Sequence, residues 1–101
     1  MLFRSVLWHA LLPGPPVAGP SLDADSVYVP IGAEGDVPGG ILAFNRDGTE
    51  RWRFRTKYQP GGGLAIGDAL WAADKDGTIY ALDPHSGKTV WLADEIGRAH
   101  V

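Results

Sequence analysis

A pattern of about 40 residues occurs twice in this sequence and constrains the fold more strongly than any other feature. Residues 41–45 recur as residues 79–83, which lie 38 positions later, and Trp52 recurs as Trp91, 39 positions later. Repeats of this length form arrays in which each copy is one structural unit that buries its apolar surface against its neighbours. We therefore expect similar units that pack side by side.

Within each copy, short runs rich in β-branched and aromatic residues alternate with clusters of Gly, Pro, Asp and Asn, which is the pattern of strands and tight turns. The runs predicted to be strands are residues 26–29, 40–44, 51–55, 69–72, 78–82 and 89–92. Three turns end in a glycine, at Gly48, Gly77 and Gly87, where a hairpin requires positive φ. No stretch of the sequence keeps the spacing of an amphipathic helix, so the sequence predicts an all-β, antiparallel fold.

The composition fits a turn-rich folded chain and excludes several kinds of protein. Of the 101 residues, 14 are Gly and 8 are Pro, while 45% are hydrophobic, so the chain can form a core but has room for one domain at most. The absence of Cys excludes disulfides and thiolate chemistry. A net charge of -3 without a long basic run argues against nucleic-acid binding, and no apolar run reaches the roughly 20 residues of a membrane-spanning helix.

Each copy supplies about four short strands, which is the content of one blade of a β-propeller. Trp8 lies 44 positions before Trp52 and is expected to take the same place in an earlier, partial copy. The predicted fold class is all-β, with antiparallel four-stranded blades of an incomplete β-propeller, about two blades plus part of a third. The predicted segments are 1–20 for the end of a preceding blade and its connection, 21–58 for the first full repeat, 59–94 for the second full repeat, and 95–101 for a non-native tail.

Residues 81–91, ALDPHSGKTVW, resemble the tryptophan-docking motif of pyrroloquinoline-quinone-type (PQQ-like) β-propeller repeats. In that motif an Ala, an Asp, a Thr-Gly-Lys turn and a Trp follow at fixed spacing, and only Ser86 departs from it, in place of Thr. Residues 43–52, AFNRDGTERW, are similar to a shortened variant, and residues 13–20 are similar to the segment that leads into an inner strand. The resemblance covers residues 6–92 and implies a bacterial protein built from such repeats.

The motif residues are expected to form the contacts between blades. An Ala leaves a flat spot, a Gly permits the hairpin bend, an Asp accepts hydrogen bonds from turn N–H groups, and a Trp reaches across to the neighbouring blade. Burying one Trp removes on the order of 200 Å² from water, which is worth up to roughly 5 kcal/mol. The residues predicted to dock blades are Trp8, Ala43, Gly48, Trp52, Ala81, Asp83, Gly87 and Trp91. Of these, Trp91 is expected to dock on a following blade.

Other candidate sites are interpreted as structural, so we predict no catalytic residue, no cofactor and no bound metal. The turn at 74–77 resembles the start of a Ca²⁺ loop, but His85 stands where an EF-hand needs Glu, and a solvated hairpin turn is the better interpretation. The histidines lack ligand spacing and are expected on the surface; they are His9, His85 and His100. The glycines at 61–63 lack the Lys and the helix of a phosphate-binding loop, and are expected to lead flexibly into an inner strand.

One basic stripe is predicted on the outer strand of the first repeat. Arg51, Arg53 and Arg55 alternate with Trp52 and Phe54, and the two-residue period of a strand places the three cations on one face. Such a stripe suits either an anionic partner or, as we expect, an outer strand whose charges prevent edge-to-edge pairing.

Both ends of the sequence have a second interpretation. Residues 1–12 have the charge and apolar run of a signal peptide, but the repeat register favours an outermost strand at residues 6–8. Residues 95–101 break the repeat and resemble the translation of a sequencing adapter. We interpret them as read-through and expect the native chain to continue.

The resemblance implies a non-catalytic scaffold, a partial PQQ-like propeller that binds proteins or ligands, as in outer-membrane assembly lipoproteins and sensory domains of bacterial protein kinases. The alternative is two blades of a PQQ-dependent alcohol or sugar dehydrogenase, whose Ca²⁺ ligands and catalytic Asp have no matching positions here. The expected partners are neighbouring blades of a parent propeller and other proteins. The resemblance allows a periplasmic or other extracytoplasmic location, which the sequence leaves open. Exposed apolar blade faces predict marginal stability and self-association.

Overall fold

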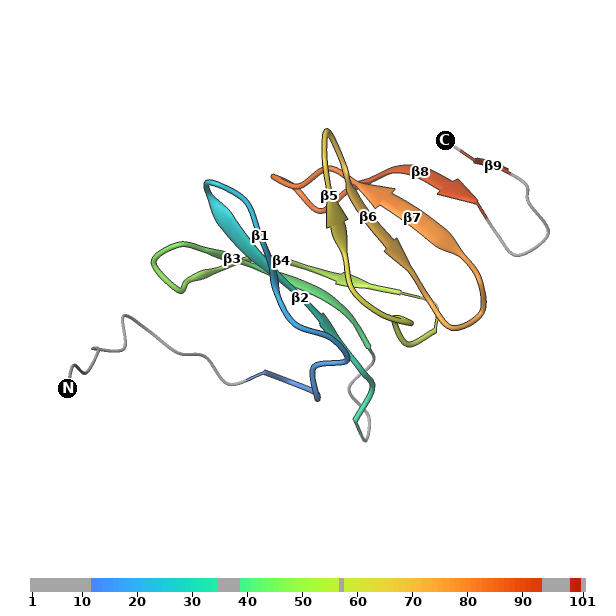
Figure 1. The fold of residues 1–101 in the computed structure, drawn as a ribbon, viewed down its shortest axis with the longest axis horizontal. Coiled ribbons are helices and arrows are strands. Elements are labelled where there is room, and N and C mark those ends of the chain that lie inside the picture. Colours follow the sequence, from blue (N-terminus) through green and yellow to red (C-terminus); the bar gives the residue numbers. More distant parts are fainter. Residues whose placement is uncertain (1–11, 35–38, 57, 94–98, 101) are drawn as a thin grey trace.

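The computed structural model describes residues 12–34, 39–56, 58–93 and 99–100, and every regular element in these ranges is a β-strand (Figure 1). The first antiparallel sheet contains, in spatial and chain order, β1 (Ser21–Leu22), β2 (Ser26–Ile31), β3 (Gly40–Asn45) and β4 (Glu50–Arg55). The second sheet repeats this order with β5 (Ala65–Ile66), β6 (Leu70–Ala73), β7 (Ile79–Leu82) and β8 (Thr89–Ala93), and ends with β9 (Ala99–His100). The predicted all-β, antiparallel fold class is confirmed.

The six strands predicted from the sequence correspond to β2, β3, β4, β6, β7 and β8. The first strand of each sheet, β1 and β5, has only two residues. Such a strand is too short to be recognised from hydrophobic periodicity in the sequence. The short strand β9 was not predicted; it pairs with Leu92 and Ala93 of β8. It falls in the segment interpreted as a non-native tail, and the origin of that segment stays a prediction. Trp8 and the strand predicted at residues 6–8 lie outside the described residues.

Tight hairpin turns form at the three glycines that the sequence singles out. The φ angles are 93° at Gly48, 92° at Gly77 and 76° at Gly87, a region that glycine adopts without steric cost. Both outer hairpins also contain a register shift at the same place, between Ala43 and Phe44 in β3 and between Ala81 and Leu82 in β7. The two sheets therefore share their turns and their irregularities, which is the expected result of an internal repeat.

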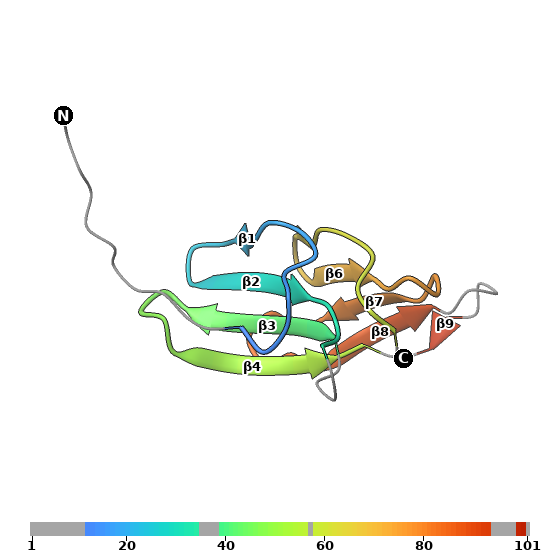
Figure 2. The same ribbon diagram turned by 90° about the horizontal axis from the view of Figure 1, so that it is seen from below.

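The main core lies between the two sheets, which pack against each other (Figures 1 and 2). Its buried side chains come from one face of β2, β3, β4, β6 and β7; they are Tyr28, Ile41, Ala43, Trp52, Leu70, Ala72, Tyr80 and Leu82. At the inner end of the core, β1 lies against β5, and the Ser21 hydroxyl donates to the Leu64 carbonyl at 3.0 Å. A second, smaller core covers the other face of the first sheet; its buried members are Val29, Ile31, Leu42 and Phe44.

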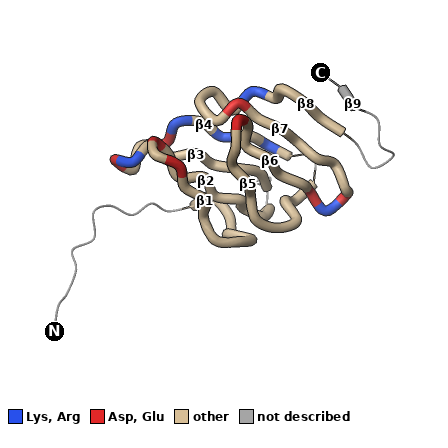
Figure 3. The backbone as a smooth tube through the Cα atoms, turned by 45° about the horizontal axis from the view of Figure 1, so that its top comes forward, with Lys and Arg blue, Asp and Glu red and all other residues tan. Residues whose placement is uncertain are grey.

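The charged residues lie mainly at the turns and on β4, while the central strands β2, β3, β6 and β7 carry none (Figure 3). Among the described residues there is no helix with the length and apolar character needed to cross a membrane.

Candidate docking site

The hairpin turn between β7 and β8 lies at the seam between the two sheets. The Asp83 amide donates to the Lys88 carbonyl, and the Gly87 amide donates to the Asp83 carbonyl, each at 2.8 Å. The Asp83 carboxylate accepts a hydrogen bond from the His85 amide at 2.8 Å. These bonds fix the turn so that the carbonyl of Pro84 and the open side of Gly87 face the first sheet.

Trp52 of the first sheet binds this turn of the second sheet. Its indole Nε1 donates to the Pro84 carbonyl at 2.8 Å. Its ring lies on Gly87, where a Cβ atom would come within 2.5 to 2.9 Å of the indole carbons. Trp52 is 9% exposed. The site therefore needs three things: an indole N–H, a backbone carbonyl opposite it, and a residue without a side chain under the ring.

Tyr28 adds a polar cluster beside Trp52. The two rings have centroids 6.0 Å apart, and the Tyr28 hydroxyl donates to the Asp23 carboxylate at 2.8 Å while lying 3.4 Å from the Pro84 carbonyl. Asp23 also accepts from the amides of Asp25 and Ser26, each at 2.8 Å. The Asp23 loop of the first sheet and the Pro84 turn of the second are thus joined through one phenol group.

The protonation of this cluster follows from its hydrogen bonds. Partial burial acts to raise the pKa of Asp23, but the hydrogen bonds from Tyr28 and from the amides of Asp25 and Ser26 outweigh it, so the pKa lies below its ordinary value. Burial, together with the neighbouring Asp23 carboxylate, raises the pKa of Tyr28 above its ordinary value. At neutral pH Asp23 is charged and Tyr28 keeps its proton, which is the arrangement that the hydrogen bond requires.

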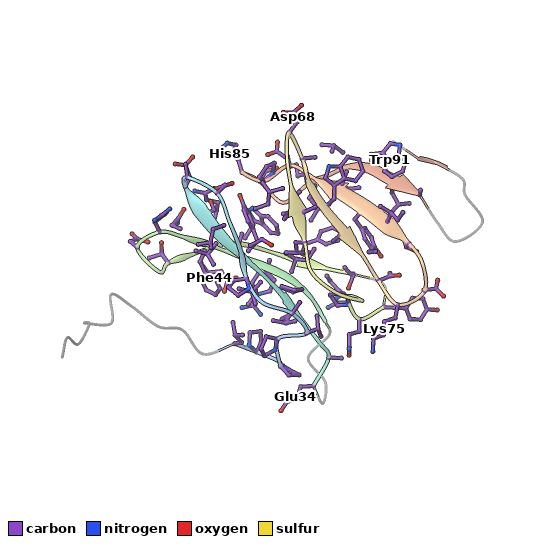
Figure 4. The ribbon with its side chains drawn as sticks, in the orientation of Figure 1. Glu34, Phe44, Asp68, Lys75, His85 and Trp91 are labelled. Atoms are coloured by element: carbon purple, nitrogen blue, oxygen red, sulfur yellow. The ribbon has the colours of Figure 1, made fainter. Side chains whose placement is uncertain are left out.

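The second sheet carries an equivalent aromatic pair on its outer side. Tyr28, Ala43 and Trp52 face one another across β2, β3 and β4, and we call them the Trp52 face. Trp71, Ala81 and Trp91 face one another across β6, β7 and β8, and we call them the Trp91 face. The centroids of Trp71 and Trp91 are 5.7 Å apart, and Trp71 is 42% exposed. Trp91 lies on β8, far from the first sheet in the view of Figure 4.

The remaining residues predicted to dock blades divide into two groups. Ala43 and Ala81 are buried between the aromatic rings of their sheets, and Gly48 occupies in the first sheet the turn position that Gly87 occupies in the second. Trp91 is half-buried, and it does not belong to the core cluster between the two sheets. Trp8 lies outside the described residues.

The turn at 74–77 is a hairpin turn, but the expectation that it is solvated is wrong for Asp74. This residue is 5% exposed, and its carboxylate accepts from the amides of Asp76 and Thr78 at 3.0 Å each and from the Tyr80 hydroxyl at 2.8 Å. The sequence contains a signal for this role, because the carboxylate of an Asp at the start of a turn can accept hydrogen bonds from the backbone amides two and four residues later. No group of three or more His, Asp or Glu in the described ranges could hold a metal ion.

The predicted basic stripe is wrong for Arg51. The register shift pairs Ala43 with Trp52 and Phe44 with Glu50, so Arg51 has no opposite residue in β3 and leaves the alternation of the strand. Its Nε donates to the Asn45 side chain at 2.8 Å.

Arg53 and Arg55 remain exposed on β4. Arg53 forms a salt bridge with Glu50 at 2.9 Å. This hydrogen-bonded pairing lowers the pKa of Glu50. The stripe therefore consists of two arginines, one of which already has an acidic partner in the chain.

The other residues considered in the sequence have simple surroundings. His85 is exposed on the docking turn (Figure 4). It lies beside a hollow of about 430 Å³ that Asp23, Asp68 and Val90 help to line. His9 and the side chain of His100 lie outside the description. The glycines at 61–63 lead into β5, and the Gly61 amide donates to the Ala73 carbonyl at 2.9 Å.

The sequence did not predict the Pro84 carbonyl as the acceptor for Trp52. Every residue has a backbone carbonyl, so the residue type at position 84 does not indicate this contact.

Comparison with known proteins adds information on the fold. No known family profile and no curated protein matches the sequence. The crystal structure of BamB from Moraxella catarrhalis is similar to this chain, with a TM-score of 0.77 and 23% sequence identity, over 91% of this chain and 28% of that one. The chain thus spans less than a third of the length of that structure. A likeness at this identity establishes the fold alone, and the two sheets are accordingly adjacent blades of a β-propeller.

Proposed function

We propose that this chain is part of a PQQ-like β-propeller repeat protein that acts as a non-catalytic scaffold binding other proteins or ligands. The observation that carries the proposal is the docking of Trp52 on the second sheet, through the Pro84 carbonyl and the bare face of Gly87. The tryptophan-docking motif of such repeats calls for this kind of contact, and the motif is present twice in the sequence. The likeness to BamB supports the propeller architecture on which the proposal depends.

In this proposal the repeats are residues 21–58 and 59–94, and residues 1–20 complete a preceding blade. The docking residues act as one set: Trp8, Ala43, Gly48, Trp52, Ala81, Asp83, Gly87 and Trp91. The Trp91 face supports this assignment, since it reproduces the cross-strand pairing of the Trp52 face and remains partly exposed. In a longer protein, a following blade with its own turn would cover that face.

The proposal has two separable tests. For the blade assignment, the full open reading frame is recovered and Trp91→Ala is compared with Trp52→Ala by chemical denaturation. We expect both changes to cost about 3 to 5 kcal/mol in the full-length protein, because both indoles would then be buried between blades. A loss at Trp91 of well under 1 kcal/mol in that protein would contradict the assignment.

For the non-catalytic role, the purified full-length protein is titrated with pyrroloquinoline quinone and Ca²⁺. We expect neither quinone-dependent dye reduction nor a quinone-dependent rise in melting temperature. Either response would overturn the scaffold proposal in favour of a dehydrogenase, because a ligand that binds the folded state raises its stability.

A further inference from the structure

The outer edge of the first sheet is open. The strands of that sheet lie in the order β1, β2, β3, β4, and among the described strands only β3 lies beside β4 (Figure 2). In an antiparallel arrangement, alternate residues of such an edge strand direct their N–H and C=O groups away from the sheet. The edge of β4 is therefore a row of backbone donors and acceptors with which an extended chain can pair.

The equivalent edge of the second sheet pairs with an extended segment. There β9 lies antiparallel to β8 and pairs with Leu92 and Ala93 (Figure 1). These two positions correspond to Arg53 and Phe54 of β4, which lie 39 residues earlier in the repeat. Pairing of this kind uses main-chain hydrogen bonds and depends little on the sequence of the added strand. Among the described strands, the repeat thus presents the same edge twice, once paired and once open.

The exposed side chains of β4 carry an ordered row of charges. Glu50, Arg53 and Arg55 pair with alternate residues of β3, so they share one face of the sheet, and all three are exposed. The two arginines lie two residues apart, which is about 7 Å along a strand. Arg53 bonds with Glu50, but an exposed pair of this kind contributes little and can be exchanged for another partner. The end of β4 at Arg53 and Arg55 therefore has an excess of positive charge.

These charges restrict which strand can pair with the edge. Opposite charges directly across two strands stabilise the pairing, and like charges destabilise it. The arginines therefore act against a basic strand, including β4 of a second copy with its three arginines and one glutamate, and favour a strand with carboxylates at alternate positions. The charges that protect the edge from self-pairing also specify its partner.

We propose that the outer edge of β4 binds an extended acidic segment of a partner protein as an added antiparallel strand. The main chain of the segment pairs with β4, and two carboxylates at alternate positions lie beside Arg53 and Arg55. The antiparallel direction follows the pairing of β9 with β8. The inference depends on the strand order and the charges of the first sheet, so it does not rest on the proposed function.

Titration of the isotope-labelled 101-residue chain with the acetylated and amidated peptide TVEVEVT, followed by amide chemical shifts, tests the proposal. We expect saturable shifts centred on β4, with a dissociation constant on the order of a millimolar, because a short segment loses much freedom when it is ordered. The peptide TVKVKVT should bind at least about tenfold more weakly, because both of its charges are reversed. Shifts centred on another part of the chain, or the absence of saturable shifts at about ten times that concentration, would overturn the proposal.

A pair of charge reversals in the protein tests the arginines. Arg53→Glu combined with Arg55→Glu should weaken the binding of TVEVEVT about tenfold or more and strengthen the binding of TVKVKVT. Lys75→Glu combined with Lys88→Glu is the matched control, since it changes the net charge equally at two exposed residues in turns of the second sheet. Equal weakening in both double variants would show that only the net charge matters, and the proposal would then be wrong.

Main-chain pairing is tested with two N-methylated forms of TVEVEVT. One form has methyl groups on the amides of both glutamates, and the other has them on the amides of the first two valines. In an antiparallel strand only one of these two sets of N–H groups points toward β4. One form should therefore lose binding while the other keeps it. Equal affinities of the two forms would overturn the proposal, because charge attraction alone does not distinguish them.

Discussion

The Trp52 face and the Trp91 face share one design but differ in what surrounds them. In both, an alanine on the central strand lies between two aromatic residues in the same register. The Trp52 face is buried by the Pro84 turn, whereas Trp71 on the Trp91 face is 42% exposed. The aromatic pair is thus a property of each repeat alone, while its burial depends on a neighbouring sheet that supplies a carbonyl and a glycine.

The two faces also differ in their polar groups. The Trp52 face includes the hydroxyl of Tyr28, bound to Asp23, whereas the Trp91 face has Trp71 in the place of Tyr28 and Gly67 in the place of Asp23. The first seam therefore combines apolar contact with a hydrogen-bonded cluster, and the second face offers almost only apolar surface. Since buried polar groups must be satisfied, the cluster also restricts which turn can dock there.

The largest expected effect comes from the same substitution on the two faces. Trp52→Ala should lower the free energy of unfolding by about 3 to 5 kcal/mol, because it empties the seam and leaves the Pro84 carbonyl without its indole donor. Trp91→Ala in the 101-residue chain should cost about 1 kcal/mol, because the indole is only half-buried. Urea denaturation at low protein concentration measures both. Equal losses would show that the two faces are covered equally well.

A smaller loss is expected from Gly87→Ala. Its φ of 76° strains any residue with a side chain, and the added methyl group would overlap the Trp52 ring. We expect a cost of about 2 to 4 kcal/mol, part of which disappears when Trp52 is already alanine. Gly77→Ala is the matched control, since it has a similar φ of 92° but lies in a different hairpin turn. A double-mutant cycle compares the losses of unfolding free energy in Gly87→Ala, Trp52→Ala and the double variant. If the two single losses are simply additive, direct packing of the Trp52 ring on Gly87 is refuted.

The strands and turns could be predicted from the sequence because they depend on local chemistry. The short runs rich in β-branched and aromatic residues located β3 and β7, and the Asp-Gly turns located the positive φ angles at Gly48 and Gly77. The equivalence of Trp52 and Trp91 within their sheets followed from the repeat, and the cross-strand register now shows it directly.

Features that depend on three-dimensional register could not be predicted in this way. The bulge that turns Arg51 out of its row arises from the pairing of β3 with β4, and a strict two-residue period misses it. The burial of Asp74 depends on Tyr80 reaching back to it, and the role of Pro84 depends on its carbonyl rather than on its ring. These contacts cannot be predicted from the residue types alone.

Tyr28→Phe tests the polar cluster without disturbing the aromatic pair. The change removes only the hydroxyl that donates to Asp23, and we expect a loss of about 1 to 2 kcal/mol in unfolding free energy. Tyr80→Phe provides a comparison, since its hydroxyl donates to the carboxylate of Asp74 at the same 2.8 Å distance but away from the Pro84 turn. If the cluster fixes the seam, Tyr28→Phe should also weaken the energetic coupling between Trp52 and Gly87, and Tyr80→Phe should not. If the coupling energy between Trp52 and Gly87 is unchanged in Tyr28→Phe, the polar cluster contributes only its own hydrogen bonds and does not fix the seam.

The smallest expected effect is a pH dependence carried by Asp23. Its pKa in the folded chain lies below the value of 3.8 of an unperturbed Asp, so its hydrogen bonds stabilise the fold fully above that value and lose their effect as the pH falls through the folded-state pKa. Asp23→Asn keeps the size of the side chain and removes the charge. The difference in unfolding free energy between the native chain and this variant should be constant from pH 7 to about pH 5 and then shrink as the pH falls below 4. Asp47 and Glu50 also have lowered pKa values, but they are present in both proteins and cancel from the difference. A difference that stays constant down to pH 2 would show that the charge of Asp23 contributes nothing to the seam.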